Sequence, residues 1–174
     1  MIFLFLDMYL ILKIHIMFSI AESLTGGMIA SSIVDIPGSS KTFKGGIVAY
    51  SLESKINILQ IDEKLVNSSN GVSKEVAENM AVNVSKLFDT QYGIATTGYA
   101  EAYDCNKAQA YVAISKDGSI IYLYHFIITN KELIAYNLLK SKIVYTSNIT
   151  PDRNTFRKFI KDTVIDEIRD LSLI

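Results

Sequence analysis

Short apolar runs rich in β-branched and aromatic residues alternate along the chain with segments whose apolar residues recur at helical spacing. The first kind predicts strands, and the second predicts helices with one buried face. The expected strands are 14–20, 43–50, 92–97, 110–114 and 120–128. The expected helices are 25–34, 51–59, a helix that begins at Ser73, and 156–171. Strands alternating with helices predict a three-layer α/β/α sandwich with a mainly parallel, mixed sheet.

Serine and glycine residues add detail to this pattern. Ser51 and Ser73 each stand before an expected helix, where a serine hydroxyl can accept a hydrogen bond from a backbone N–H group. Gly45 and Gly46 interrupt the strand expected at 43–50, and paired glycines inside a strand indicate a bulge or the close approach of another backbone.

The first twenty residues are mostly apolar, but Asp7, Lys13 and His15 interrupt them. A membrane span needs about twenty uninterrupted apolar residues, and neither the basic start nor the small-residue cleavage site of a signal peptide is clear. We therefore expect a short helix followed by a buried strand that ends near Ile20. A membrane anchor in residues 1–20 is the competing interpretation.

The chain length suits one domain. We expect a single domain over residues 1–174, in which residues 1–12 form an N-terminal extension or helix. A start codon assigned too far upstream is a further interpretation, since Met8 and Met17 could also begin the chain.

Composition excludes several classes of function. The hydrophobic fraction of 49% and the charged fraction of 20% are typical of a packed globular protein. A net charge of -1 gives no electrostatic reason to expect nucleic acid. The single cysteine, Cys105, excludes an intramolecular disulfide and favours a cytoplasmic location. The two histidines, His15 and His125, do not have ligand spacing, so we expect neither a metal nor another cofactor.

Polar residues follow three of the expected strands. Ser23 to Thr25, Tyr50 to Ser51 and Thr97 to Gly98 all stand at predicted strand ends. Ligands of α/β proteins bind at the carboxyl ends of strands. The pattern therefore predicts a binding site where these segments meet.

The segment 37–55 holds candidate catalytic residues: Ser40 in a Pro-Gly-Ser-Ser turn, Tyr50 and Lys55. A hydroxyl and an amine that meet across a turn are the minimum parts of a nucleophilic site without histidine. Lysine acts as a base only where desolvation or a nearby cation lowers its pKa. The plainer interpretation is a turn serine, a core tyrosine and a solvated lysine.

Five segments carry a family resemblance. They are 21–27 (Ala-Glu-Ser-Leu-Thr-Gly-Gly), 37–55, 71–81, 96–98 (Thr-Thr-Gly) and 152–157 (Asp-Arg-Asn-Thr-Phe-Arg). On these motifs the chain resembles, over about residues 10–172, the C-terminal domain of the competence-damage-inducible CinA proteins, the nicotinamide-nucleotide amidase family.

The resemblance implies hydrolysis of nicotinamide mononucleotide to nicotinic acid mononucleotide and ammonia, in pyridine nucleotide salvage. By position, Ser40 would be the nucleophile, Lys55 its general base and Tyr50 an assisting group. The residues expected to bind substrate are Ser23, Thr25, Gly26, Gly45, Gly46, Thr97 and Arg153. The partners implied are a small-molecule nucleotide and further copies of the chain in a homodimer or larger homo-oligomer, with no nucleic acid and no membrane.

Two departures from the family pattern support a second hypothesis. A glycine-rich loop of the family is here residues 99–106, where Glu101 and Asp104 would repel a phosphate if they faced the pocket. The segment 127–145 is longer than the family expects, and another alignment would place Asn130 at the position of Arg153. The second hypothesis is a catalytically impaired member that acts as a nucleotide-binding or oligomer-forming module.

Overall fold

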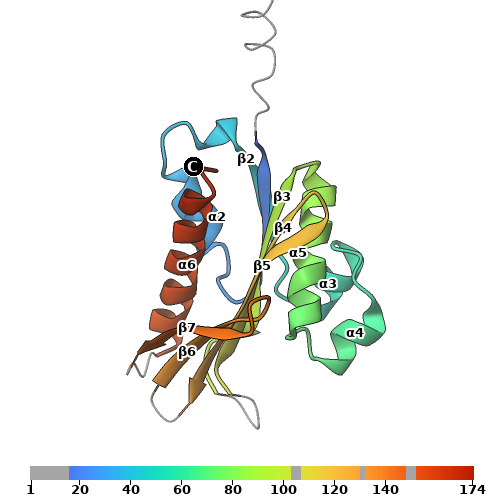
Figure 1. The fold of residues 1–174 in the computed structure, drawn as a ribbon. Helices are drawn as coiled ribbons and strands as arrows, with labels where there is room; N and C mark the ends of the chain where they lie inside the picture. Colours follow the sequence, from blue (N-terminus) through green and yellow to red (C-terminus); the bar gives the residue numbers. More distant parts are fainter. Residues whose placement is uncertain (1–15, 103–106, 130–131, 148–151) are drawn as a thin grey trace, which may run out of the picture.

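The computed structural model describes residues 16–102, 107–129, 132–147 and 152–174. A seven-stranded sheet with the order β2-β1-β3-β4-β5-β6-β7 forms its centre (Figure 1). The strands are β1 (Phe18–Glu22), β2 (Phe43–Val48), β3 (Tyr92–Tyr99), β4 (Gln109–Lys116), β5 (Ser119–Thr129), β6 (Glu132–Asn137) and β7 (Lys142–Ser147). The extension expected at 1–12, together with Asp104 and Asn130, lies outside the described residues.

Helices cover both faces of the sheet. They are α2 (Met28–Val34), the 3-10 turn η1 (Ser39–Lys41), α3 (Leu52–Asn57), α4 (Glu63–Ser68), α5 (Lys74–Phe88) and α6 (Arg153–Asp170). Figure 1 shows α2 and α6 on one side of the sheet and α3, α4 and α5 on the other. The predicted three-layer α/β/α sandwich is therefore confirmed. The helix-start predictions at Ser51 and Ser73 are also confirmed, because both side chains accept N-cap bonds. Helix α4 was not predicted.

The sheet is mixed, but parallel pairs do not predominate. Strand β1 runs parallel to β2 and β3, whereas the four pairs from β3–β4 to β6–β7 are antiparallel. The reason is the length of the connections, since a parallel crossover needs a dozen or more residues. Strands β4 and β5 are joined by Asp117 and Gly118, both with positive φ, as in a tight hairpin turn. The expectation of a mainly parallel sheet was wrong.

The segment expected to be an insertion, 127–145, extends the sheet. It forms the end of β5, strand β6 and part of β7, which is the exposed edge strand at one end of the sheet order. The residues of β7 up to Thr146 are exposed. No helix in the described part of the chain is both long and apolar enough to cross a membrane.

Two cores lie on opposite faces of the sheet. Phe18 and Ile20 of β1 belong to the core shared with α2 and α6. Ala21, the next residue, belongs to the core shared with α5. Strands buried on both faces have continuous apolar sequences, which explains why β1 is fully buried.

Glycine lets the backbones in these layers approach closely. A Cβ atom on Gly46 would lie 2.7 Å from the carbonyl oxygen of Ile20, and one on Gly45 would lie 2.9 Å from the Phe88 ring. The β1–β2 register also shifts beside Gly45. The predicted bulge and close approach at these glycines are both confirmed. Helix α5 packs equally closely on the sheet, because a Cβ atom on Gly93 would lie 1.8 Å from the Ala81 carbonyl oxygen.

This close contact makes Gly93 a sensitive test of the packing of α5 on β3. We predict that Gly93→Ala lowers the free energy of unfolding by about 3 kcal/mol, because the added methyl group must displace helix backbone. Urea denaturation would measure the loss. The matched control is Gly118→Ala, whose Cβ meets nothing within 4 Å and whose positive φ costs only about 1 kcal/mol. Equal losses in the two variants would contradict the proposed packing constraint.

Candidate active site

The carboxyl ends of the three parallel-paired strands meet at one edge of the sheet. Glu22, the last residue of β1, is in register with both Val48 of β2 and Thr96 of β3. The segments that follow these strands therefore lie side by side, as their places at strand ends predicted. The backbone N–H of Ser23 donates to the Thr96 carbonyl at 2.9 Å and joins two of these segments directly.

A buried lysine–serine pair occupies this edge. Lys55, in the last turn of α3, is only 2% exposed. Its Nζ donates to the Oγ of Ser23 at 3.0 Å, to the Ala49 carbonyl at 2.8 Å and to the Tyr50 carbonyl at 3.4 Å. The sequence analysis named Lys55 as a candidate catalytic residue but placed Ser23 only among the binding residues. The signal for Ser23 was its position at the end of β1, on the same edge as Tyr50.

The surroundings of Lys55 favour its neutral form. The three oxygen atoms bonded to Nζ belong to a hydroxyl and two carbonyls, which carry no charge. Burial lowers the pKa of Lys55 from 10.5 to about 8, since desolvation penalises the ammonium form. A sizeable fraction of the amine is therefore neutral near physiological pH and can accept a proton from Ser23.

Glu22 fixes the loop that carries Ser23. Its carboxylate is 1% exposed and accepts three backbone N–H groups at the start of α2, from Gly27 at 2.9 Å, Ile29 at 3.2 Å and Ala30 at 2.8 Å. A carboxylate at this position is stabilised by the positive end of the helix. These N–H groups are consequently engaged by the protein itself, and a phosphate would have to displace Glu22 to reach them.

Gly26 serves the packing of α6 against the same loop. Its φ of +61° is in the left-handed region, and a Cβ atom would lie 2.8 Å from Nη2 of Arg157. Arg157 donates to the carbonyls of Leu24 and Thr25 at 2.9 and 3.1 Å. The predicted binding residue Gly26 therefore lies where Arg157 ties α6 to the serine loop.

The predicted threonines lie behind the pair and are buried. The hydroxyl of Thr25 is bonded to that of Thr96 at 2.8 Å, and the hydroxyl of Thr97 donates to the Gly71 carbonyl at 2.6 Å. A Cβ atom on Gly71 would lie 3.3 Å from Cδ of Lys55. Thr97 thus holds the backbone that packs against the lysine side chain.

Ser40 lies at the other edge of the sheet. It belongs to η1, directly before β2, and it is exposed. The β2 strand that separates η1 from the Lys55 edge spans about 16 Å at the usual rise of a strand. The expected Ser40–Lys55 pair is contradicted by this geometry, because Lys55 meets Ser23 instead. Gly45 and Gly46 lie inside β2, where packing accounts for them, and not at the site.

A pocket of about 220 Å³ opens beside the lysine–serine pair. Its lining residues are Leu24, Tyr50, Gly98, Tyr99, Ala100, Glu101 and Arg153. Leu24 follows Ser23 in the chain, and the Tyr50 carbonyl accepts from Lys55. Arg153 lies in the wall of this pocket, and its role in binding substrate stays a prediction. Its Nη1 donates to Oε1 of Glu101 at 2.9 Å, and its Nη2 donates to the Tyr50 hydroxyl at 3.3 Å.

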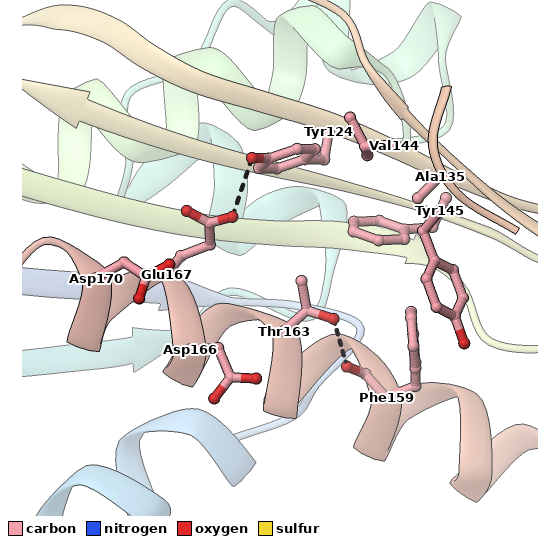
Figure 2. A pocket seen from close by; sticks show the side chains of 10 residues that line it. Tyr124, Ala135, Val144, Tyr145, Phe159, Thr163, Asp166, Glu167 and Asp170 are labelled. Carbon is pink, nitrogen blue, oxygen red and sulfur yellow. Dashed lines mark hydrogen bonds between the residues drawn. The ribbon is translucent and has the colours of Figure 1, made fainter. Parts of the chain in front are cut away.

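A second pocket, of about 320 Å³, lies between α6 and the antiparallel part of the sheet (Figure 2). The Tyr124 hydroxyl donates to Glu167, and the Thr163 hydroxyl donates to the Phe159 carbonyl. Burial raises the pKa of both Tyr124 and Glu167. The described residues that line this pocket belong to α6 and to strands β5, β6 and β7. In the first pocket, Leu24 follows Ser23 in the chain and the Tyr50 carbonyl accepts from Lys55, so we place the candidate chemistry there.

Within the described residues, no group of three or more histidine, cysteine, aspartate or glutamate side chains is arranged to hold a metal ion.

The chain matches the family model of the CinA C-terminal domain over residues 8–127. It is similar to a CinA-like protein of Flavobacterium psychrophilum, with 51% identity over 82 residues, 47% of this chain and 20% of that protein. It is also similar to a putative competence-damage inducible protein of Clostridium kluyveri, with 48% identity over 82 residues and the same coverages, 47% and 20%. The match thus spans a fifth of these relatives' length.

Two solved structures share the fold. One is a competence-damaged protein (CinA) superfamily protein from Escherichia coli, with a TM-score of 0.70 and 22% identity, covering 95% of this chain and 86% of that chain. The other is the competence/damage inducible protein CihA from Agrobacterium tumefaciens, with a TM-score of 0.69 and 23% identity, covering 91% and 86%. Identities this low support the fold alone, and the residues of the site are argued from their own geometry.

Burial of the Lys55 amine makes the free energy of unfolding depend on pH. Well below pH 8 Lys55 is charged in both the folded and the unfolded chain, so the folded state bears the full cost of burial. Between pH 8 and 10.5 the folded state loses this proton first, so stability rises with pH. We predict that the unfolding free energy of the wild type, relative to Lys55→Met, increases by up to about 3 kcal/mol across this window.

Urea denaturation of both proteins at pH 7.5 and pH 10 would measure this increase. Other titrating groups cancel in the difference, because the two proteins share them. A difference that stays constant would show that the amine keeps an ordinary pKa in the folded state, and a difference that falls as the pH rises would show a raised pKa. Either result would contradict the prediction.

Proposed function

The chain belongs to the CinA C-terminal domain family, and from that premise we propose that it is an amidohydrolase in which Ser23 is the nucleophile and Lys55 its general base. The observation that carries the proposal is the 3.0 Å hydrogen bond from the buried Lys55 amine to the Ser23 hydroxyl. A serine hydroxyl is a weak nucleophile until an adjacent base accepts its proton. Lys55 is the group placed to do so.

In the first half of the reaction, neutral Lys55 accepts the proton of Ser23 as Oγ attacks the carboxamide carbon. The tetrahedral intermediate then collapses. The C–N bond breaks, the Lys55 ammonium returns the proton to the leaving nitrogen, and ammonia departs. Ser23 now carries an acyl ester. The same group acts first as base and then as acid, which requires a pKa near the working pH.

In the second half, water attacks the ester carbon while Lys55 accepts a proton from the water. The ester bond breaks, and the proton passes to Ser23 Oγ. The products are the free acid and the regenerated hydroxyl–amine pair. The net reaction is one amide and one water to one carboxylic acid and one ammonia.

The substrate proposed first is nicotinamide mononucleotide, on the strength of the family resemblance. Tyr50 and Arg153 line the pocket beside the pair, and a guanidinium with planar donors suits a phosphate. The products would be nicotinic acid mononucleotide and ammonia. The homo-oligomeric assembly and the cytoplasmic location expected from the sequence stay predictions.

The competing function is a catalytically impaired nucleotide-binding or oligomer-forming module. The observation that favours it is the ion pair of Arg153 with Glu101, in a loop that departs from the family pattern. We prefer the amidohydrolase because the loop that departs from the family pattern lies at the outer wall of the pocket. The serine, the lysine and the oxygens that hold the amine are in place behind it.

Two matched serine variants test the choice of nucleophile. We predict that Ser23→Ala lowers kcat for ammonia release from nicotinamide mononucleotide by about 1000-fold or more, because the attacking oxygen is lost. Ser40→Ala, at the far edge of the sheet, should keep kcat within about twofold of the wild type. Ammonia and the acid product would be quantified together, with circular dichroism as the check on folding. Loss of activity in Ser40→Ala with retention in Ser23→Ala would reverse the assignment.

The pH dependence of the reaction tests the base. Because Lys55 must be neutral to accept the Ser23 proton, kcat/KM should rise with pH through a midpoint near 8 and then level off. Initial rates from pH 6 to 10 at constant ionic strength would give the profile. A rate that is flat across this range, or that falls through pH 8, would rule out a neutral lysine as the base.

A further inference from the structure

We propose that Glu101 is a specificity-determining residue that biases the pocket against the phosphate of a carboxamide nucleotide, so that the unphosphorylated nucleoside carboxamide is a substrate as well. The inference rests on the proposed function, since it concerns the substrate of the same site. It refines that function by naming the charge that the pocket accepts.

The first support is that Glu101 already pairs with Arg153, the cation that a phosphate would bind. One nitrogen of Arg153 donates to the Glu101 carboxylate at 2.9 Å, and the other donates to the Tyr50 hydroxyl at 3.3 Å. A guanidinium binds phosphate through two parallel N–H groups. Here each of these nitrogens already donates one bond to the pocket wall, and one of the partners carries the same negative charge as a phosphate.

The second support is the charge of the pocket as a whole. Among the described residues that line it, Arg153 is the one cation and Glu101 the one anion, so their formal charges cancel. Arg157 lies nearby, but it donates to the carbonyls of Leu24 and Thr25. Lys55 is buried and its amine is held by Ser23 and two carbonyls. The described residues that line the pocket therefore offer no surplus of positive charge to a dianion.

The third support comes from the two helices that begin beside the pocket. Helix N-termini are favourable places for a phosphate. At α2 the N–H groups are bonded to the carboxylate of Glu22. At α6 the N-cap is Asp152, whose carboxylate accepts the Thr155 N–H at 2.8 Å. Each helix start already holds a negative charge supplied by the chain.

The ion pair itself contributes little to the fold. The Arg153 and Glu101 side chains are 44% and 61% exposed, and exposed pairs stabilise proteins only weakly. Removing the charge of Glu101 should therefore leave the melting temperature unchanged within about 2 °C. Its effect should be on the charge of the ligand, which makes substrate preference the property to measure.

The test compares nicotinamide mononucleotide with nicotinamide riboside, which is the same carboxamide without the phosphate. For the wild type, Glu101→Gln and the control Glu78→Gln on α5, kcat/KM for ammonia release would be measured with both compounds. We expect the wild type to release ammonia from both compounds. The ratio of nucleotide to riboside kcat/KM should rise about tenfold in Glu101→Gln, as expected for removal of one repulsive charge at a partly exposed site. It should stay unchanged in Glu78→Gln.

A binding measurement separates this inference from the proposed function. Calorimetry with Ser23→Ala, and with the same variant also carrying Glu101→Gln, would give Kd for both compounds without turnover. Selective tightening of the nucleotide by Glu101→Gln supports the role of Glu101 even if the wild type hydrolyses neither compound, an outcome that would defeat only the amidohydrolase. A ratio that Glu101→Gln does not change, in turnover or in binding, overturns the inference and leaves the amidohydrolase standing. Failure of both compounds to bind overturns the inference as well.

Discussion

Burying a lysine amine costs free energy unless the surroundings supply hydrogen-bond acceptors, and Lys55 meets this condition through one hydroxyl and two carbonyls. Each acceptor comes from a segment that follows a parallel strand. The Ser51 cap sets where α3 begins, and this start places Lys55 in the last turn, beside the strand ends. The parallel pairing of β1 with β2 is thus a requirement of the site as much as of the sheet.

Among the residues that the structure describes, no carboxylate is a hydrogen-bond partner of Lys55, and this keeps the pKa of its amine low. A carboxylate at the position of Ser23 would hold the lysine as an ammonium ion and raise its pKa. The nearby carboxylate of Glu22 is instead committed to the N–H groups at the start of α2. One buried acid, which precedes Ser23 in the chain, and one buried base therefore have separate partners. This separation allows the amine to lose its proton near neutral pH.

The sequence predicted the layers and the helix starts well, because amphipathic spacing and serine caps are local signals. It predicted the strand directions less well, although the Asp117–Gly118 pair is itself a local sign of a hairpin. The expected contact between Ser40 and Lys55 was wrong for a different reason. Ser40 is close to Lys55 in the chain, but an extended strand separates them, whereas Ser23 reaches Lys55 only through the pairing of β1 with β2. Sequence proximity was the wrong measure of spatial proximity.

The site divides into a chemical part and a recognition part that come from different stretches of chain. The pair of Ser23 and Lys55 lies within the segment that matches the family model, while Arg153 lies beyond its end at residue 127. The bond from Arg153 to Glu101 joins α6 to the loop after β3 and was invisible in the sequence, since 52 positions separate the two residues. Because this bond is exposed and the amine is buried, a change at Glu101 can alter the accepted charge without disturbing the pair behind it. Such an arrangement permits substrate preference to diverge within a family while the serine, the lysine and the strands that hold them stay the same.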